Sequence, residues 1–446
     1  MSRLLLRIGL WVPLATAVAV FPQGAEAQAT APTKPASAST SPTESQSEPQ
    51  EETEEDLQTL RAVKETFGKS IAELEQEYAG KLAEAPEAVR MLLTIARGSN
   101  TGPEDGWYGP GKWKYSYDWL LTAHAKQKGT YLADDDFRGL PHWLARIDRN
   151  HDGQVTPEDL DWSDRNPWVQ QASTINRILR RMDPDADGFI AEGEWNSFFR
   201  RVAQGQDAVH PDDLIDVLLA GVGSPVRSGP GDVISKNILL RGLIGGEIGS
   251  LKEGPNVGDP APDFELKTHD GRGMIRLADL LGKQPIVLTF GNFTCPPFRL
   301  NYSGVEAVYR RFSHEATFLS IYVREAHPNE GWKMAFNTRL GIEVSQPKTY
   351  GERVSVANQC HGVLKYSMPL LVDEIDDRVG NAYSGMPARM YVIDPQGKVV
   401  YKSGRGPFGF RPGEMEQALV MCLLEQHLAQ QRGPAGKPTP ASEKRP

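Results

Sequence analysis

The chain has 446 residues, too many for a single hydrophobic core, and this length indicates two or three domains with tails. A formal net charge of −9, with no segment dense in Lys and Arg, argues against a nucleic-acid partner. The only cysteines are Cys295, Cys360 and Cys422, so disulfides do not build the fold and at least one thiol is left over.

Residues 1–27 have the pattern of an export signal. Basic residues are followed by an apolar run, and Ala25-Glu26-Ala27 supplies small side chains where a signal peptidase cleaves. We therefore expect a periplasmic or extracellular protein without stable membrane insertion after cleavage. The alternative is an uncleaved anchor, because the apolar run approaches spanning length. Residues 28–56 are rich in Pro, Ser, Thr, Ala and Glu, which predicts a disordered, flexible tether.

Residues 57–130 combine helical periodicity with a dense aromatic stretch. Apolar residues recur three or four positions apart as far as Ile95, which predicts one or two amphipathic helices. The aromatic residues that follow are Trp107, Tyr108, Trp113, Tyr115, Tyr117 and Trp119. Such a cluster can stack on carbohydrate, but packing against the next domain of the chain is the commoner fate of aromatic side chains.

Residues 131–222 contain two copies of the EF-hand calcium loop. This loop places side-chain oxygens at positions one, three, five and twelve, a backbone carbonyl at seven and a glycine at six. The predicted ligands are Asp148, Asn150, Asp152, Gln154 and Asp159 in the first loop and Asp183, Asp185, Asp187, Phe189 and Glu194 in the second. We expect Val155 and Ile190 to pack the loops together, and the shorter Asp159 to weaken the first site. The alternative for each loop is an acidic turn without a metal.

A separate α/β domain is predicted at residues 254–430, after a linker at 223–253 and before a disordered tail at 431–446. It begins with a hairpin around Asp270-Gly271, and the apolar run Ile286 to Phe290 then predicts a central strand buried on both faces. The remaining predicted elements are strands at 317–323, 370–372, 390–393 and 398–402 and helices at 354–364 and 412–430. This order is typical of a thioredoxin-like fold. The expected fold class is therefore an α/β thioredoxin-like C-terminal domain plus an all-α EF-hand N-terminal domain.

Cys295 stands at the turn between the central strand and the helix that begins at Pro296. A helix N-terminus lowers a thiol pKa, and open α/β sheets place their sites at the carboxyl ends of strands, so Cys295 is the predicted nucleophile. The alternative is a small buried side chain. Cys360 is either a resolving cysteine or a buried helix cysteine, and Cys422 is predicted to lie in the core. Pro387 occupies the place of the cis-proline that faces the reactive cysteine in this fold.

The α/β domain also carries motifs that are specific in combination. They are Phe290-Gly291-Asn292-Phe293-Thr294-Cys295-Pro296-Pro297-Phe298, Tyr322-Val323-Arg324-Glu325-Ala326-His327-Pro328, Gly331-Trp332, Arg353, Asp373 with Tyr383, Arg389 and Gly404-Arg405-Gly406-Pro407. With these motifs the domain resembles the iodothyronine deiodinase family within the redoxin branch of thioredoxin-like proteins.

The resemblance implies roles for individual residues. Cys295 stands where the family carries its selenocysteine nucleophile, and Glu325 and His327 are the pair that manages the proton. The substrate-binding residues implied are Arg389, Pro387 and Trp332. Independently of the family, Glu325 and His327 lie two positions apart just after a strand next to the Cys295 strand, so both can face one rim of the sheet.

Departures from the family pattern limit what the resemblance implies. Sulfur replaces selenium, Phe293 replaces a cysteine, and Pro347 occupies the place of a histidine that many members carry. We predict an exported, calcium-binding thiol oxidoreductase with deiodinase-like reductive dehalogenation, regenerated by an external thiol or a thioredoxin-type reductant. Its small-molecule substrate is a halogenated aromatic, a peroxide or a disulfide, and the oligomeric state is left open. The alternatives are a thiol peroxidase or disulfide reductase, and a calcium-dependent interaction protein with an inactive redoxin domain.

Overall fold

The computed structural model describes residues 53–98, 111–127, 130–185, 187–219, 235–406 and 409–431. The predicted export signal, nearly all of the tether, Trp107, Tyr108, Pro407 and the C-terminal tail lie outside these residues. The chain divides into a unit of residues 1–51 and a unit of residues 52–446, and every described residue belongs to the second unit. No helix among the described residues is long and apolar enough to cross a membrane.

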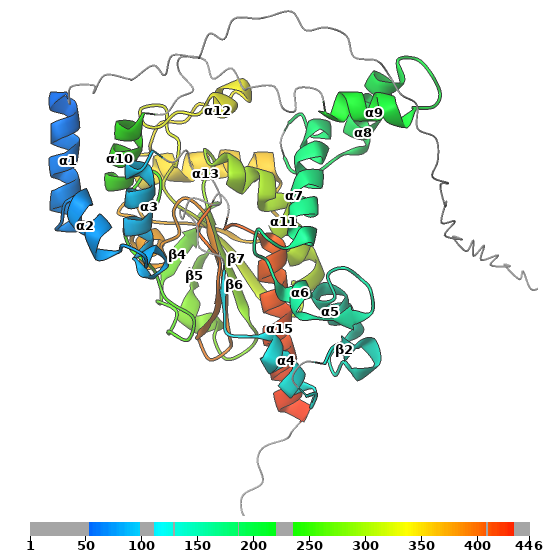
Figure 1. Cartoon of the computed structure of the whole chain (residues 1–446). Coiled ribbons are helices and arrows are strands. Elements are labelled where there is room, and N and C mark those ends of the chain that lie inside the picture. The colour runs from blue at the N-terminus through cyan, green and yellow to red at the C-terminus, as the bar shows by residue number, and fades with distance from the viewer. Residues whose placement is uncertain are drawn as a thin grey trace, which may run out of the picture. The chain divides into compact units, whose positions relative to one another are not determined.

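A mixed sheet lies at the centre of the described fold (Figure 1). Its eight described strands follow the order β1-β10-β9-β6-β7-β8-β4-β5. Their bounds are β1 Lys112–Trp113, β4 Glu265–Thr268, β5 Met274–Arg276, β6 Ile286–Gly291, β7 Thr317–Tyr322, β8 Leu370–Val372, β9 Arg389–Ile393 and β10 Val399–Lys402. The predicted strands and the hairpin formed by β4 and β5 are confirmed, with differences of one residue at their ends.

Strand β6 is central because its side chains are apolar on both faces. All six of its residues are buried. It runs parallel to β7, with Leu288 opposite Leu319, and antiparallel to β9, with Leu288 opposite Tyr391. A strand with a parallel neighbour on one side and an antiparallel hairpin on the other is the core of a thioredoxin-like sheet, as predicted. This order brings the carboxyl ends of β6 and β7 to the same edge.

Helices cover this sheet. The helices of the C-terminal half are α11 Pro296–Phe312, α12 Ala335–Arg339, α13 Tyr350–Leu364, α14 Arg378–Ala382 and α15 Pro412–Gln431. Cys422 and its neighbours Met421 and Leu423 on α15 lie in the main core, so the prediction for Cys422 is confirmed. The helix predicted at 354–364 begins four residues earlier because Thr349 caps it, accepting a hydrogen bond from the backbone N–H of Glu352.

The helices of the N-terminal half fall into two groups. Helices α1 Glu54–Phe67, α2 Ile71–Glu77 and α3 Glu87–Ala96 pack with α10 Lys236–Ile244 around a separate apolar cluster that includes Val63, Leu92 and Leu240. Figure 1 shows these four helices side by side. The others are α4 Tyr117–Ala123, α5 Pro141–Ile147, α6 Pro157–Leu160, α7 Pro167–Leu179, α8 Glu192–Ala203 and α9 Pro211–Leu219.

Strand β1 was not predicted from the sequence. Trp113 lies opposite Tyr401 of β10, with the two rings edge to face at 5.9 Å, and its indole N–H donates to Glu414. Tyr115 is buried and donates its hydroxyl proton to Glu425. These two aromatic residues therefore pack against the α/β domain, whereas the sequence predicted packing against the domain that follows them in the chain.

The predicted contact between the two acidic loops is wrong. Val155, in β3 (Gln154–Val155), pairs with Leu132 in β2 (Leu132–Ala133), and these strands form a separate two-stranded sheet. Ile190 instead is 38% exposed. The region predicted to be all-α therefore contains a small sheet, and the apolar partner of Val155 comes from the segment before the first loop.

Candidate active site

Cys295 is the N-cap residue of α11, one short loop beyond the end of β6. Pro296 and Pro297 occupy the first helical turn, where an amide hydrogen would have no intrahelical partner. Asn292, inside the loop, donates its side-chain N–H to the carbonyl of Pro387 at 3.0 Å. The Met386–Pro387 peptide is cis, as predicted. A hydrogen bond therefore links the loop that leads to Cys295 with the backbone of Pro387.

The expectation of a lowered thiol pKa at Cys295 is wrong for this conformation. Cys295 is only 2% exposed, and burial raises its pKa to about 11, although the Phe298 amide and the Arg299 charge oppose the rise. Burial also raises the pKa of Cys422, to about 12, and that of Cys360. Desolvation of the thiolate therefore outweighs the helix N-terminus. A reagent must gain access to Cys295 before the thiolate can form.

Glu325 is fully buried and linked to the residue that precedes the cysteine. Its Oε2 accepts hydrogen bonds from the backbone N–H and hydroxyl of Thr294, at 2.9 and 2.7 Å, and its Oε1 accepts one from the Tyr322 hydroxyl. Burial raises the pKa of Glu325, while these donors lower it in part. The carboxyl group is therefore hydrogen-bonded to the residue next to Cys295. Because it is buried, it favours the neutral form more than an exposed glutamate does.

His327 is fixed by the chain that follows it. Its Nδ1 donates to the carbonyl of Trp332 at 2.9 Å, and the two rings meet edge to face. Its backbone N–H donates to the hydroxyl of Thr294. Burial lowers the pKa of His327 to about 4, so the ring is neutral near pH 7 and Nε2 carries a lone pair. The Nε2 atom of His327 is thus a hydrogen-bond acceptor near pH 7.

Thr294 joins the two predicted residues, and sequence reasoning missed it. Its hydroxyl donates to Glu325 and accepts from the backbone of His327. Thr294 therefore links the carboxylate of Glu325 to the backbone of His327. The position of Thr294 next to Cys295 could have indicated a role at the site, but a single threonine at that position belongs to no specific motif.

Arg299 is a second missed residue. It lies one turn into α11, is 1% exposed, and donates to the carbonyl of Phe293 and, at 2.9 Å, to Asn337 Oδ1. Its positive charge lowers the pKa of Cys295. A spacing of four residues on a helix places Arg299 and Cys295 on one face. From the sequence, this spacing could have predicted that Arg299 lies near the thiol. Arg299 can stabilise negative charge that develops on the sulfur.

Cys360 and the predicted substrate residues lie in different places. Cys360 is buried on α13, and all three thiols are free. Trp332 contacts His327, as expected for a residue at the site. Arg389 points elsewhere, because its Nη2 pairs with Glu87 of α3 at 2.6 Å and its side chain is fully buried. Arg389 therefore has an internal partner where the sequence predicted a substrate contact.

Known proteins match the region that carries this geometry. Residues 238–422 match the sequence profile of the iodothyronine deiodinase family. The chain is 30% identical over 215 residues to thyroxine 5-deiodinase of Rattus norvegicus, covering 46% of this chain and 68% of that protein. It is 31% identical over 202 residues to the Gallus gallus protein of the same name, covering 44% and 76%. The chain belongs to the iodothyronine deiodinase family.

Family membership supports an oxidoreductase enzyme, and it confirms the resemblance predicted for the C-terminal domain. A third relative, thyroxine 5-deiodinase of Bos taurus, is 33% identical over 181 residues, and the chain spans 56% of its length. Helices α1 to α9 all precede the match to the deiodinase profile, which begins in α10. The deiodinase relatives therefore account for the Cys295 domain.

Solved structures with a similar arrangement are less informative. A putative thiol:disulfide interchange protein from Chlorobium tepidum has 19% sequence identity and a TM-score of 0.28, covering 38% of this chain and 98% of that one. A secreted disulfide oxidoreductase from Mycobacterium tuberculosis has 15% identity and a TM-score of 0.27, covering 35% and 95%. Because these TM-scores are low, the thioredoxin-like fold is inferred from the strand order of the sheet.

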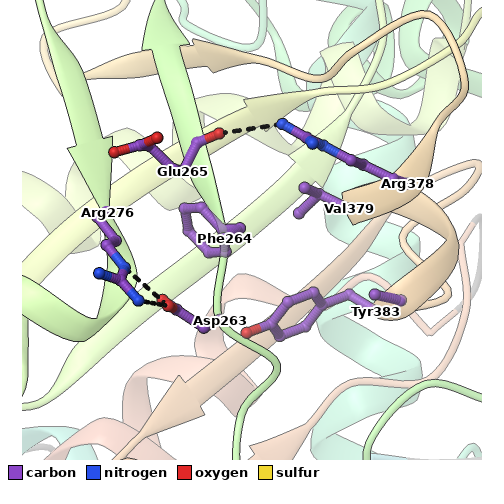
Figure 2. A pocket seen from close by; sticks show the side chains of 8 residues that line it. Asp263, Phe264, Glu265, Arg276, Arg378, Val379 and Tyr383 are labelled. Carbon is purple, nitrogen blue, oxygen red and sulfur yellow. Dashed lines mark hydrogen bonds and ion pairs between the residues drawn. The ribbon is translucent and has the colours of Figure 1, made fainter.

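Among the cavities lined by described residues of the deiodinase-family domain, two involve its sheet strands or the segments that follow them. One of about 470 Å³ lies between β4, β5 and α14, and Figure 2 shows the ion pair of Arg276 with Asp263 and the hydrogen bond of Arg378 to the backbone of Glu265 at its wall. It contains none of the predicted catalytic residues. The other, about 250 Å³, is lined by the segment 244–252, by residues at the end of β7 and by Met386. The second cavity therefore adjoins the cis-proline.

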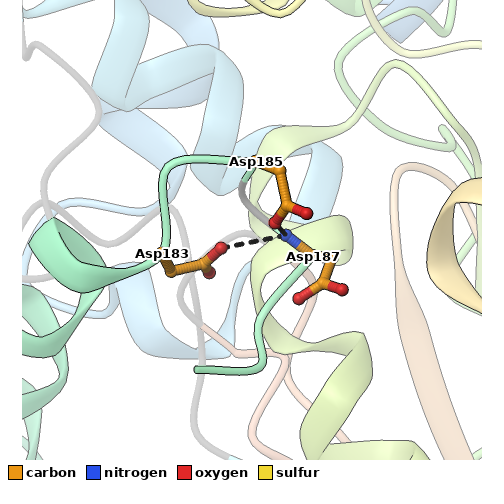
Figure 3. Close-up of side chains that lie close together, drawn as sticks. All are labelled: Asp183, Asp185 and Asp187. Carbon is orange, nitrogen blue, oxygen red and sulfur yellow. Dashed lines mark hydrogen bonds between the residues drawn. The ribbon is translucent and has the colours of Figure 1, made fainter. Parts of the chain in front are cut away.

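Three carboxylates of the second acidic loop converge. Ligand oxygens of Asp183, Asp185 and Asp187 lie within 4.8 Å of one another, and Figure 3 shows the carboxylates of Asp183 and Asp185 directed at the backbone N–H of Asp187. Burial, with the charges of its neighbours, raises the pKa of Asp183 to about 6. Glu194 Oε1 is buried without a hydrogen-bond partner among the described residues. A cation would relieve both effects, so this loop fits a metal ion.

The first acidic loop has the same turn as the second, but the carboxylate at its twelfth position, Asp159, is buried and hydrogen-bonded within the loop. Asp148 accepts from Gly153 N–H at 3.0 Å, as Asp183 does from Gly188 N–H. Asp159, however, is 2% exposed and accepts hydrogen bonds from Arg149 and Thr156 within the loop. These donors compete with a metal for the carboxylate. The predicted ranking of the two loops stays a prediction.

Proposed function

We propose that the chain is a thiol-dependent reductive dehalogenase of small halogenated aromatic molecules, with Cys295 as the nucleophile. The observation that carries this proposal is the arrangement of Cys295 at the start of α11 beside Thr294, whose hydroxyl bonds to the Glu325 carboxylate and to the backbone of His327. Burial shifts the pKa values of Glu325 and His327 in opposite directions, which is the arrangement expected of an acid and a base. The names of the relatives support the substrate class.

The proposed reaction has three steps. The Cys295 sulfur attacks the halogen, the carbon–halogen bond breaks with its electron pair left on carbon, and a proton from Glu325 converts that carbon to C–H. The sulfur then carries the halogen. An external thiol displaces halide from it to form a mixed disulfide, and a second thiol releases Cys295. The aromatic ring is reduced, and two equivalents of external thiol are oxidised to a disulfide.

His327 orients the substrate in this scheme. Its Nε2 lone pair accepts a hydrogen bond from a phenolic hydroxyl, because Nδ1 is committed to the Trp332 carbonyl. Sharing of the phenolic proton with His327 would place more electron density on the ring carbon that bears the halogen, so that this carbon takes the proton from Glu325 more readily as the carbon–halogen bond breaks. In this scheme Glu325 donates a proton to the ring carbon, and His327 accepts the hydrogen of the phenolic hydroxyl.

The test is a substrate panel with added dithiothreitol. Iodinated phenols, hydrogen peroxide and a small disulfide are each supplied to the wild-type chain and to Cys295→Ser, and iodide release or substrate loss is followed. Iodide release that requires Cys295 supports the proposal. Consumption of peroxide or disulfide without iodide release would favour the thiol peroxidase or disulfide reductase alternative. No reaction in any arm would leave the calcium-dependent interaction protein as the better account.

We further propose that the second acidic loop binds calcium and that the protein is exported. Asp183, Asp185, Asp187 and Glu194 would hold the ion, with the Phe189 carbonyl as a fifth ligand. The bound ion would supply positive charge that neutralises the buried carboxylates. Export follows from the sequence of residues 1–27, and N-terminal sequencing of protein secreted from cells would show cleavage after Ala27 if the proposal is right.

A further inference from the structure

Arg299 is a buried cation whose hydrogen-bond acceptors are neutral. It is 1% exposed, and no ion pair among the described residues includes it. Its two Nη atoms donate to the carbonyl of Phe293 and to Oδ1 of Asn337. The rings of Phe293 and Phe336 each lie 5.8 Å from the guanidinium carbon. A buried charge without an opposite charge is costly. The guanidinium therefore carries a positive charge that none of these contacts cancels.

Several ionisable side chains lie close enough to interact with this charge. They are Cys295, Cys360, Glu325 and Tyr322, and the interaction with Cys295 is the strongest of them. Burial raises the pKa of Cys360, Glu325 and Tyr322, so each of these groups favours its neutral form. Both oxygens of Glu325 also accept hydrogen bonds from groups other than Arg299. The anion that Arg299 is best placed to stabilise is therefore the one formed at Cys295, four residues earlier on α11.

Asn337 connects this cation to the backbone next to Cys295. It lies on α12 and is 1% exposed. Its Oδ1 accepts from Arg299 at 2.9 Å, while its Nδ2 donates to the carbonyl of Thr294 at 2.7 Å. A guanidinium can only donate and a carbonyl can only accept, so the Asn337 amide has one possible orientation. A single side chain thus fixes both the guanidinium and the peptide carbonyl that comes just before Cys295.

The neutrality of Asn337 matters for the thiol. A carboxylate of the same shape would form an ion pair with Arg299, and the pair would present little net charge to a neighbouring anion. The amide instead accepts the hydrogen bond of the guanidinium and leaves its charge intact. In a buried environment such a charge acts strongly on a nearby anion. Arg299 can therefore favour the Cys295 thiolate as long as its partner at position 337 is uncharged.

We propose that Asn337 is a positioning residue for Cys295: its amide holds the Arg299 guanidinium one turn along α11 without neutralising it, so that the positive charge serves the anion formed at the sulfur. This inference rests on the proposed function only in taking Cys295 as the reacting thiol. In the proposed reaction the thiolate is needed twice. It attacks the halogen, and it is the leaving group when the second external thiol releases Cys295 from the mixed disulfide.

The test follows the alkylation of individual thiols in the full-length chain. Wild type, Asn337→Asp and Asn337→Leu are treated with iodoacetamide from pH 7 to 10, and mass spectrometry gives the labelling rate of Cys295 relative to Cys422. Cys422 is buried on α15 and reports general opening of the fold. We expect Asn337→Asp to lower this relative rate about tenfold at each pH, and Asn337→Leu, which removes both hydrogen bonds but adds no charge, to lower it less than about threefold.

Two further variants make the result decisive. Asn358→Asp adds the same negative charge at an exposed position of α13 and should leave the relative rate unchanged. Arg299→Met removes the cation and should slow Cys295 as Asn337→Asp does, which decides the question if Asn337→Asp opens the fold. Equal slowing in Asn337→Asp and Asn337→Leu, or an unchanged rate in Arg299→Met, would overturn the proposal. Because no dehalogenation is measured, this outcome is independent of the substrate panel.

Discussion

Glu325 and His327 lie two positions apart in the chain, yet burial moves their pKa values in opposite directions. The sequence predicted that both residues and Cys295 share one rim, because the ends of adjacent parallel strands meet there. It did not predict their ionisation, because desolvation depends on what the rest of the chain places over them. For the same reason, the helix N-terminus suggested an acidic thiol where burial produces a weakly acidic one.

The first prediction concerns the ionisation of Cys295. Since its pKa is about 11, the thiolate fraction rises about tenfold with each pH unit below that value, and the alkylation rate should rise with it from pH 7 to 10. Labelling by iodoacetamide, quantified for each cysteine, checks this slope. A rate that is already flat by pH 8 would mean that the thiol ionises far more easily than this conformation allows.

The second prediction separates nucleophile from proton transfer. Glu325→Gln and His327→Ala should each lower kcat by roughly 10²- to 10⁴-fold, the usual range for a lost acid or base. Alkylation of Cys295 should persist in both, because neither side chain is needed for the sulfur to react with iodoacetamide. Loss of alkylation in His327→Ala would instead make the histidine a base that activates the thiol.

At the scale of elements, the sequence was most informative where a strand is buried on both faces. The continuous apolar run of β6 and the prolines after Cys295 fixed a strand, a turn and a helix with little ambiguity. Strand β1 was missed because two residues, Lys112 and Trp113, are strand only by pairing with β10. The partner of Val155 was likewise set by a long-range contact that local pattern does not encode.

The third prediction concerns the junction between β6 and α11. A Cβ at Gly291 would lie 2.2 Å from the buried ring of Phe298, so Gly291→Ala must displace the first turn of α11. We expect a loss of about 1–3 kcal/mol in the free energy of unfolding, as for other overpacked cores, together with reduced activity.

The matched control is Gly362→Ala in α13, where no atom lies within 4 Å of the added Cβ. This exposed helical site should gain roughly 0.5–1 kcal/mol, because alanine favours the helix. Chemical denaturation of both variants gives the comparison. If the two changes had the same effect, the contact between Gly291 and Phe298 would not be what sets the start of α11.

At the scale of the molecule, the acidic loops join the deiodinase-family domain directly. Lys365, at the end of α13, pairs with Asp187 at 2.8 Å, and Arg310 of α11 lies over the ring of Phe189. The two-domain organisation inferred from motifs did not include these contacts, since contacts between distant segments leave no local pattern. A metal in the second loop would therefore act next to the helix that begins at Cys295.

The fourth prediction is that calcium stabilises the full-length chain. An ion that binds only the folded state raises Tm by mass action, with an affinity on the order of 10⁻⁴ to 10⁻³ M expected for an extracellular module. Glu194→Gln should remove most of the rise in Tm, and Asp159→Asn less. Lys365→Gln should strengthen calcium binding, because the ammonium competes for Asp187.

Calorimetry with calcium and with chelator provides the measurement, alongside kcat under both conditions. A rise in Tm with little change in kcat is expected of a structural ion. A large calcium-dependent change in kcat without a shift in Tm would make the loops a switch on the active site.

The most direct test of the central claim is a single turnover without added reductant. Wild type, Cys295→Ser and Cys422→Ser are mixed with excess 2,6-diiodophenol, and the iodide released per chain is counted. If Cys295 takes the iodine and its sulfur then loses iodide to water or to a second thiol, wild type and Cys422→Ser should each release one equivalent and then stop, and Cys295→Ser should release none. Equal iodide release from wild type and Cys295→Ser would contradict the assignment of Cys295 as the nucleophile.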